Sequence, residues 1–245
     1  MRSIAGLFVF LFMFSSSLFA QDFVIEDDGL SDSIKKVLTI IPFQNNYYRS
    51  EIDRALALNE KINFDQLRDR LRNELDRQLY VALQEDYDIV SFLKDDTEED
   101  RELLNYIFYS TASQYTQVES GEAVDRRLLA NGQLIETPKQ EGQSYMKTVI
   151  HHPPLLNTLQ ESRPSDWFLF IGELDILIPQ SIDENADNRN VNVHYTLFDD
   201  EMNILDSGII TQVIPSKKCR YIKDISETGF VPIAYKFKEL LSQIQ

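Results

Sequence analysis

Two carboxylates lie close together in an otherwise apolar stretch of the sequence. Glu173 and Asp175 are two positions apart in a segment that alternates in the manner of a strand, so both side chains belong to one face. Such a pair can act as general acid and general base if its surroundings keep one group protonated and the other ionised. A solvated sheet face shows the same pattern, and we assign no catalytic residue from it.

Histidine is scarce, and two of the 3 histidines are adjacent. In a strand, His151 and His152 would point to opposite faces, so they could share a metal only if the backbone turns at Pro153 and Pro154. His194 and a carboxylate would also have to converge on them. The alternative is a pair of polar residues beside a proline turn, and we predict neither a metal nor a cofactor.

The single cysteine lies in a basic cluster. Lys217, Lys218 and Arg220 flank Cys219, and their charges would lower its thiol pKa and favour the reactive thiolate. No histidine is nearby in the sequence to assist it. The cluster is also a positive patch on an acidic protein, which could dock an anionic partner, although a solvated loop has the same composition.

A polar and aromatic segment follows the first predicted strand. It contains Asn46, Tyr47, Tyr48, Arg49 and Asp53. In open α/β sheets, ligands bind beyond the carboxyl ends of the strands, and tyrosine and arginine anchor many protein interfaces. We interpret these residues as a recognition loop. The alternative is a connection whose tyrosines pack against the sheet.

The usual motifs of nucleophilic, nucleotide-dependent and zinc-dependent enzymes are absent. The sequence has no G-x-S-x-G, G-x-G-x-x-G, G-x-x-x-x-G-K or H-E-x-x-H motif. With 8 glycines in 245 residues, it also offers little material for loops that bind phosphate. These absences weaken an enzymatic interpretation without excluding it.

Hydrophobic periodicity predicts the elements that must position these residues. Residues 36–43 are a short apolar run typical of a strand that is buried on both faces. A helix over 63–83 has an apolar stripe and begins with a capping box. A second strand over 87–93 and a second helix over 97–113 follow.

The second half begins with a polar stretch over 114–165, rich in glycine and proline, which we interpret as an insertion or lid. It contains short pieces of regular structure at 124–129 and 145–150. A strand, a hairpin and a closing helix are then predicted at 167–178, 191–198 with 204–214, and 230–244. This order predicts an α/β (α+β) fold with a mixed central sheet and helices packed on it, as a two-layer or three-layer sandwich over 35–245.

The first residues have the composition of a secretory signal peptide. Arg2 precedes an apolar block over 7–14, and Ala20 is a small residue before the expected cleavage point. An uncleaved membrane anchor is the alternative. Gln21 stands where a bacterial lipoprotein needs cysteine, and 21–34 is an acidic, flexible leader. We therefore expect a periplasmic or secreted protein without a lipid anchor.

The charge of the chain narrows the range of partners. A formal net charge of −16 repels phosphate backbones, so we predict no binding to nucleic acid. After the signal segment no apolar run reaches the length of a membrane span. The expected partners are proteins of the cell envelope.

Several of these segments together resemble a group of bacterial envelope domains. The matching pieces are the strand that ends at Pro42 and Phe43, the long leucine-rich helix, the strand over 167–172, the hairpin and the closing helix. The chain resembles the amino-terminal periplasmic domain of the Tol-system translocation protein. It also resembles the lipoproteins that secrete curli or activate penicillin-binding proteins. The resemblance implies a non-catalytic scaffold or adaptor and carries over no site residues.

Three functional hypotheses follow. The first is an exported, non-catalytic envelope protein that acts as a scaffold, adaptor or binding module through residues 47–53 and 114–165. The second is a secreted carboxylate-dependent hydrolase that uses Glu173 and Asp175, assisted by His151 or His152. The third is a protein that binds a small ligand or a cell-wall fragment. Converging acids and histidines in a cleft would favour the enzyme, and an exposed tyrosine-rich patch would favour the adaptor.

Overall fold

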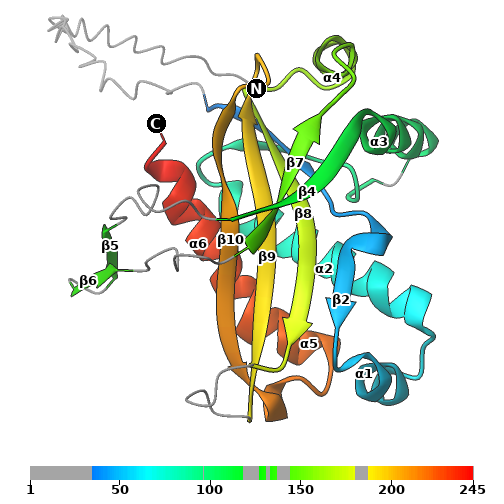
Figure 1. The fold of residues 1–245 in the computed structure, drawn as a ribbon, viewed down its shortest axis with the longest axis vertical. Coiled ribbons are helices and arrows are strands. Elements are labelled where there is room, and N and C mark those ends of the chain that lie inside the picture. The colour runs from blue at the N-terminus through cyan, green and yellow to red at the C-terminus, as the bar shows by residue number, and fades with distance from the viewer. Residues whose placement is uncertain are drawn as a thin grey trace, which may run out of the picture. The chain divides into compact units, whose positions relative to one another are not determined.

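A mixed β-sheet forms the centre of the protein. The computed structural model describes residues 35–95, 97–117, 127–130, 133–136, 144–179 and 187–244. The strand order of the sheet is β10-β9-β8-β1-β3, and β2 also pairs with β8 (Figure 1). The strands are β1 (Val37–Ile41), β2 (Tyr48–Ser50), β3 (Asp88–Ser91), β8 (Trp167–Leu177), β9 (Asn188–Asp199) and β10 (Ile204–Pro215). The strands β1, β2, β3 and β8 are parallel, whereas β9 is antiparallel to β8 and β10.

One face of the sheet is covered by helices with apolar stripes. The elements on this side are α1 (Asp53–Glu60), α2 (Phe64–Leu83), α5 (Ile222–Ile225), the π-helical turn Ser226–Phe230 and α6 (Val231–Ser242). The capping box of α2 forms as predicted, because Asn63 accepts from the Gln66 backbone and the Gln66 side chain accepts from the Asn63 backbone. Buried leucines of α2 and α6 then pack on alternate residues of β8 and β9.

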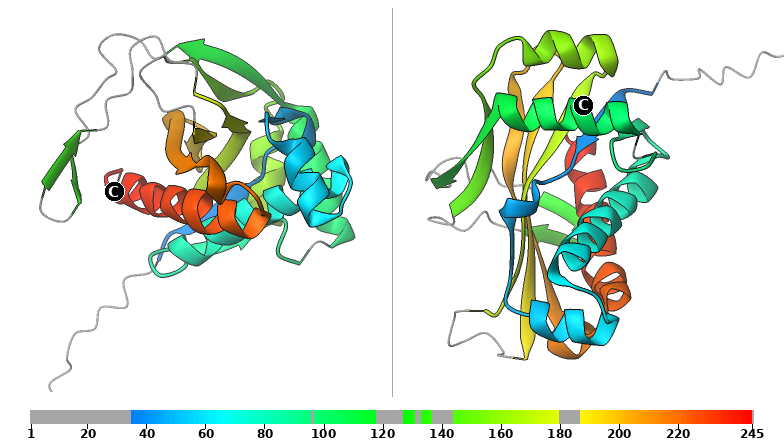
Figure 2. Two further views of the ribbon diagram at one scale, coloured as in Figure 1. Left: turned by 90° about the horizontal axis from the view of Figure 1, so that it is seen from below. Right: turned by 90° about the vertical axis from the view of Figure 1, so that its right-hand side faces the viewer.

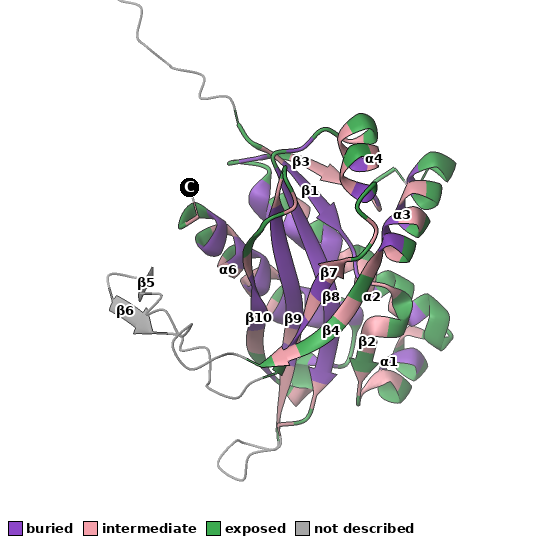
Figure 3. Cartoon of the chain, turned by 45° about the horizontal axis from the view of Figure 1, so that its top comes forward, coloured by how far each residue is buried: buried purple, intermediate pink, exposed green. Residues whose placement is uncertain are grey.

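The opposite face carries a second apolar cluster and a short two-stranded ribbon. Helices α3 (Glu98–Ser110) and α4 (Leu155–Ser162) pack on Phe168, Phe170 and Phe198. The ribbon consists of β4 (Thr111–Gln117) and β7 (Ser144–Ile150) in antiparallel register. Figure 2 shows it on the other side of the sheet from α2, α5 and α6. The strands therefore have cover on both sides, and β8 is buried along nearly its whole length (Figure 3).

The predicted fold class is confirmed: the protein is a mixed α/β fold with helices packed against a mixed sheet. The predicted order of strands and helices is present, and the described residues from Lys35 onward form one compact unit. The signal segment and leader over 1–34 lie outside the described residues. In the described part of the chain, no helix combines the length and the apolar character needed to cross a membrane.

The structure of the polar stretch over 114–165 differs in part from the prediction. The helix predicted over 97–113 ends at Ser110, and the chain enters β4 at Thr111. The predicted piece at 145–150 is β7, while the piece at 124–129 lies only in part within the described residues, where β5 (Arg127–Ala130) pairs with β6 (Gln133–Glu136). The stretch thus supplies strands and a helix to the second face of the sheet.

Candidate functional site

A β-bulge sets the direction of the two carboxylates. The pairing of β8 with β9 shifts register between Ile171 and Glu173, so Gly172 is an extra residue and the alternation of side chains restarts after it. Trp167, Leu169 and Ile171 face the α2 and α6 layer together with Leu174 and Ile176. Without the shift, the side chains of Glu173 and Asp175 would point to the same face as those of residues 167, 169 and 171, and they would enter that apolar layer. With it, both acids face the β4–β7 ribbon.

Glycine at position 172 also lets the ribbon approach the sheet. A Cβ atom at this position would lie 3.2 Å from the backbone oxygen of Met146 in β7 and 3.7 Å from that of His194 in β9. The first distance is tighter than ordinary van der Waals contact, and backbone atoms yield less readily than the end of a side chain. Gly172 therefore serves both the bulge and the crossing of β7.

His194 of β9 joins the ribbon to the acids. Its Nδ1 atom accepts a hydrogen bond from the backbone N–H of Met146 at 2.8 Å, and its Nε2 atom lies 3.2 Å from Oδ2 of Asp175. Because Nδ1 accepts, the ring proton is on Nε2 and is donated to Asp175. Two residues further along, Thr148 N–H donates to Oγ1 of Thr196 at 2.9 Å. Side chains of β9 thus satisfy backbone donors on the edge of β7 that faces away from β4.

Arg49 closes the cluster from a distant part of the sequence. It lies opposite Asp175 in the parallel pairing of β2 with β8. Its Nε atom is 2.9 Å from Oδ1 of Asp175 and 2.9 Å from Oε1 of Glu173, and its Nη2 atom donates to Oδ2 of Asp175 at 2.9 Å. The fork of guanidinium donors suits the two carboxylates.

Tyr115 of β4 completes the arrangement, which we call the ionic cluster: Arg49, Tyr115, Glu173, Asp175 and His194. The Tyr115 hydroxyl donates to Oε2 of Glu173 at 2.6 Å, and its ring centroid is 5.8 Å from the Arg49 guanidinium carbon. The side chains of Glu173, Asp175 and His194 are each 2% exposed, whereas Arg49 and Tyr115 are each 52% exposed. The cluster therefore has a buried acidic floor and an exposed upper layer of arginine and tyrosine.

The two acids differ in their affinity for protons. Burial raises the pKa of Glu173, and the nearby charge of Asp175 raises it further. The hydrogen bond from Tyr115 lowers this pKa, but by less than burial raises it. Burial also opposes ionisation of Asp175, but hydrogen bonds from His194 and Arg49 outweigh it and hold the pKa of Asp175 below its usual value. The hydrogen bond to Asp175 in turn raises the pKa of Arg49.

The ionic cluster also contains residues of the types that bind metal ions, but its hydrogen bonds disfavour metal binding. Ligand atoms of Glu173, Asp175 and His194 lie within 4.8 Å of one another. The Arg49 guanidinium already pairs with both carboxylates from the open side. A histidine that ligates through Nε2 normally donates its Nδ1–H to an acceptor, whereas Nδ1 of His194 accepts a hydrogen bond. The arrangement therefore fits a structural ion cluster better than a metal centre.

The adjacent histidines lie on a different part of the second face. The Nδ1 atom of His152 is 3.2 Å from the Tyr106 hydroxyl, and its ring packs edge-on against Tyr106 and Tyr109 of α3. His151 N–H bonds the backbone of Ser110. Among the described residues, the convergence required of a metal site occurs around His194 and does not include the adjacent pair.

The predicted recognition loop is divided between the two faces of the sheet. Tyr48 stacks on Phe43 with ring centroids 6.5 Å apart, and its hydroxyl donates to Oδ1 of Asp53 at 2.5 Å. Burial, together with this hydrogen bond, raises the pKa of Tyr48. Tyr48 therefore packs toward the α1 and α2 side, while its neighbour Arg49 points to the ionic cluster. Asn46 is exposed and Tyr47 half-buried in a 3₁₀ turn before β2.

The basic residues of this cluster are exposed, whereas its cysteine is buried. Lys217, Lys218 and Arg220 are exposed, and the backbone oxygen of Arg220 accepts from Asn59 of α1 at 3.0 Å. The expected lowering of the Cys219 pKa is wrong: the residue is 6% exposed, and burial raises its pKa to about 11. Lysines that project into water do not offset the loss of solvent around the sulfur.

The fold and the cluster define this chain as an α/β protein with a closed ionic centre beneath an exposed arginine–tyrosine pair. No protein-family model matches the sequence, and no curated protein matches it. Among solved structures, the chain is similar to the hypothetical protein CT253 from Chlamydia trachomatis, with 12% identity and a TM-score of 0.37. The match covers 86% of this chain and 95% of that one. It carries neither a function nor site residues to the present protein.

Proposed function

We propose that this chain is an exported, non-catalytic protein of the bacterial envelope that binds another protein through the surface around Arg49 and Tyr115. The observation that carries the proposal is the contact between these two side chains. Each is 52% exposed, and the ring lies 5.8 Å from the guanidinium carbon. Arg49 belongs to the segment that the sequence predicts to be a recognition loop. Tyr115 belongs to the stretch over 114–165, which the sequence also predicts to be a binding surface.

Arginine and tyrosine are enriched among the residues that dominate binding energy at protein interfaces. In this protein both are held before any partner arrives. Glu173 and Asp175 fix the guanidinium from below, and the hydrogen bond to Glu173 fixes the tyrosine ring. Side chains that are already ordered lose less conformational entropy on binding, which favours affinity.

The same geometry argues against the hydrolase hypothesis. A general acid or base must come within hydrogen-bonding distance of the substrate atom that it serves. Glu173 and Asp175 are 2% exposed and already engaged by Arg49, Tyr115 and His194. A substrate would reach them only after Arg49 and Tyr115 had moved, and this would leave two buried acids without their cation.

The basic residue, the apolar block and the small residue at the start of the chain support export and an envelope location. The resemblance to envelope scaffold domains that was noted in the sequence favours an adaptor as well. The partner expected for this surface is an envelope protein that offers carboxylate or aromatic groups to Arg49 and Tyr115.

The test is partner capture with a matched pair of tyrosine variants. Tagged protein is isolated from detergent-extracted envelopes after mild crosslinking, and co-purifying proteins are identified by mass spectrometry. Tyr115→Ala should reduce recovery of the specific partner, whereas Tyr235→Ala should not. Tyr235 is a suitable control because it is 57% exposed but lies on α6, on the other side of the sheet. Recovery of wild-type protein without a partner, or equal recovery with both variants, would refute the proposal and redirect the work to substrate screens.

A further inference from the structure

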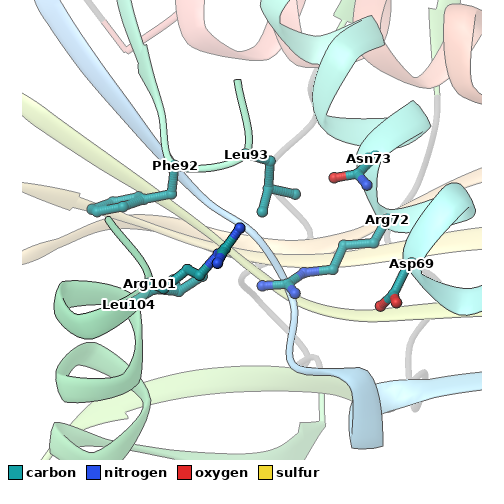
Figure 4. Close-up of a pocket in the computed structure, with 7 residues that line it drawn as sticks. All are labelled: Asp69, Arg72, Asn73, Phe92, Leu93, Arg101 and Leu104. Carbon is teal, nitrogen blue, oxygen red and sulfur yellow. The ribbon is translucent and has the colours of Figure 1, made fainter. Parts of the chain in front are cut away.

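Two groups of cations outside the ionic cluster differ in their surroundings. The first group lines a pocket of about 340 Å³ between α2 and α3, and Figure 4 shows its side chains, among them Arg72 and Arg101. The Arg72 guanidinium carbon lies 5.9 Å from the ring centroid of Phe108, and both arginines have interactions of their own. These guanidiniums are already engaged, so we assign no ligand to the pocket.

The second group is the basic segment 217–223, which follows β10. Lys217, Lys218, Arg220 and Lys223 are four cations within seven residues, and no acidic residue stands among them. All four are exposed. In the part of the chain that the structure describes, the ion pair that they make joins Lys223 to Glu227, with 3.6 Å between Nζ and Oε1. The charges of the other three therefore face solvent.

Apolar surface accompanies these charges. Tyr221 lies inside the segment and is 49% exposed, and Leu58 of α1 is 70% exposed. The side chain of Asn59, the next residue of α1, donates to the backbone oxygen of Arg220 at 3.0 Å, so this helix packs against the segment. Figures 1 and 2 both show α1 close to α5, which begins directly after Tyr221. We call this surface the basic tip: Leu58, Lys217, Lys218, Arg220, Tyr221 and Lys223.

The residue types of the basic tip suit an anionic lipid surface better than a protein. Three of its four cations are lysines, which are flexible point charges without the planar fork that lets arginine pair with a single carboxylate. Lysine is depleted at protein interfaces, whereas clusters of about four to eight lysines and arginines bind anionic lipid headgroups. Tyrosine is enriched where the apolar part of a bilayer meets water.

We propose that the basic tip binds the headgroup surface of a bilayer that contains anionic phospholipids. Its cations approach the lipid phosphates, and Tyr221 and Leu58 enter the boundary between headgroups and acyl chains. The net charge of −16 does not prevent this contact, because exposed charges more than about 10 Å away are largely screened at an ionic strength of about 0.1 M. The basic tip shares no residue with the surface around Arg49 and Tyr115, so either proposal can fail without the other.

The test is cosedimentation of the exported protein with two kinds of vesicle. One kind contains phosphatidylcholine alone, and the other contains phosphatidylcholine and phosphatidylglycerol in equal amounts. We expect binding to the mixed vesicles, weaker binding to phosphatidylcholine alone, and release of bound protein as salt screens the attraction. Equal binding to both vesicles, or binding to neither, would overturn the proposal. Release by inorganic phosphate but not by chloride at the same ionic strength would overturn it as well, because a small-anion site would then be responsible.

Matched charge changes locate the contact. The double variant Lys217→Gln/Lys218→Gln should weaken binding to mixed vesicles by about fivefold for each lysine replaced. Lys35→Gln/Lys36→Gln is the control, because these lysines are also adjacent and exposed. They precede β1 beside the start of β8, whereas β10 leads to the basic tip at the other end of the sheet.

All these variants carry the same amino-terminal segment, so a difference between them reports on the replaced lysines. Unchanged affinity in the Lys217→Gln/Lys218→Gln variant, or an equal loss in the control, would overturn the proposed contact. If the wild-type protein did not bind vesicles and this variant instead lost a co-purifying acidic protein, the basic tip would be a protein-docking surface and the proposal would fail.

Tryptophan fluorescence tests the insertion of Tyr221. The protein has one tryptophan, Trp167, which is 5% exposed, so a second tryptophan at an exposed position reports on its own surroundings. In Tyr221→Trp, emission should shift to shorter wavelength when mixed vesicles are added, because the indole leaves water. Tyr109→Trp is the matched control, since Tyr109 is 75% exposed but lies on α3. No shift in Tyr221→Trp, or an equal shift in Tyr109→Trp, would contradict the assignment of the basic tip.

Discussion

The ionic cluster and the pocket between α2 and α3 both use arginines, but in opposite ways. In the cluster, Arg49 is bound by two acids that are each 2% exposed, and the guanidinium closes the space above them. In the pocket, Arg72 and Arg101 line a volume of about 340 Å³ beside apolar residues. An arginine that pairs with buried acids contributes to stability, whereas the charge of an exposed arginine such as Arg101 is solvated by water and contributes little. The same residue type therefore contributes differently to stability in the two regions.

The largest effect is expected when the cation of the cluster is removed. Arg49→Ala would leave Glu173 and Asp175 buried without their guanidinium, and it should lower the free energy of unfolding by about 3 kcal/mol. Urea denaturation at neutral pH measures the change. Arg54→Ala, at an exposed position of α1, is the control and should change stability by less than about 0.5 kcal/mol. A similar small loss in both variants would show that the acids do not need Arg49.

The next largest effect concerns the crossing of β7 over the sheet. Gly172→Ala would put a Cβ atom 3.2 Å from the Met146 backbone oxygen and should cost about 2 kcal/mol of unfolding free energy. In Gly229→Ala the nearest atom to the new Cβ is Cγ2 of Val191 at 3.4 Å, an ordinary contact, so the loss should be smaller. Thermal unfolding of both variants checks the order. If Gly229→Ala lowered the unfolding temperature more than Gly172→Ala, the close approach of β7 at Gly172 would not be important for stability.

A smaller effect is expected from the side chains that hold the ribbon. Thr196→Val keeps the shape of the residue but leaves the Thr148 N–H without its acceptor, at a cost of about 1 kcal/mol. Amide hydrogen exchange at Thr148 should accelerate. Thr211→Val removes a hydroxyl that bonds the Asn192 side chain in β9, so it should leave exchange at Thr148 unchanged. Unaltered exchange in Thr196→Val would mean that the ribbon is held by packing alone.

The two acids of the cluster should affect the pH dependence of stability with opposite signs. The folded-state pKa of Glu173 is raised, so its ionisation costs stability as pH rises. The stability of Glu173→Gln relative to wild type should therefore increase as pH rises above the unfolded-state pKa of about 4. The folded-state pKa of Asp175 is lowered, so its contribution is present above the unfolded pKa and is lost as pH falls. Asp175→Asn should therefore lose most at neutral pH and approach wild type in acid. Urea titrations across this range test both signs, and parallel curves for the two variants would contradict the opposed shifts.

The smallest effect on stability is expected in the pocket. Arg101→Gln changes an exposed side chain of α3, so the free energy of unfolding should stay within about 0.5 kcal/mol of wild type. Together with Arg49→Ala, this variant separates an arginine that pairs with buried acids from one that is exposed to solvent. A loss of stability as large as that of Arg49→Ala would remove the distinction between the two regions.

Much of the local structure followed from the sequence because it depends on neighbouring residues. The capping box of α2 needs only Asn63 and Gln66, three positions apart. The hairpin of β9 and β10 followed from two alternating runs around a short turn. The shared face of Glu173 and Asp175 was predictable for the same reason, since alternation within a strand is local.

The sequence by itself thus determined the longer helices and strands, the fold class and the position of the two acids on one strand face, but not the short elements β2, β4, α4 and α5. Only the tertiary structure decided what those acids contact. Arg49 is 126 positions from Asp175, and its contact depends on the parallel pairing of β2 with β8. Tyr115 and Met146 reach the cluster through a ribbon whose crossing requires the bulge at Gly172. The burial of Cys219 also could not be predicted from the sequence, because the charges beside a residue in the sequence do not reveal how much solvent surrounds it in the fold.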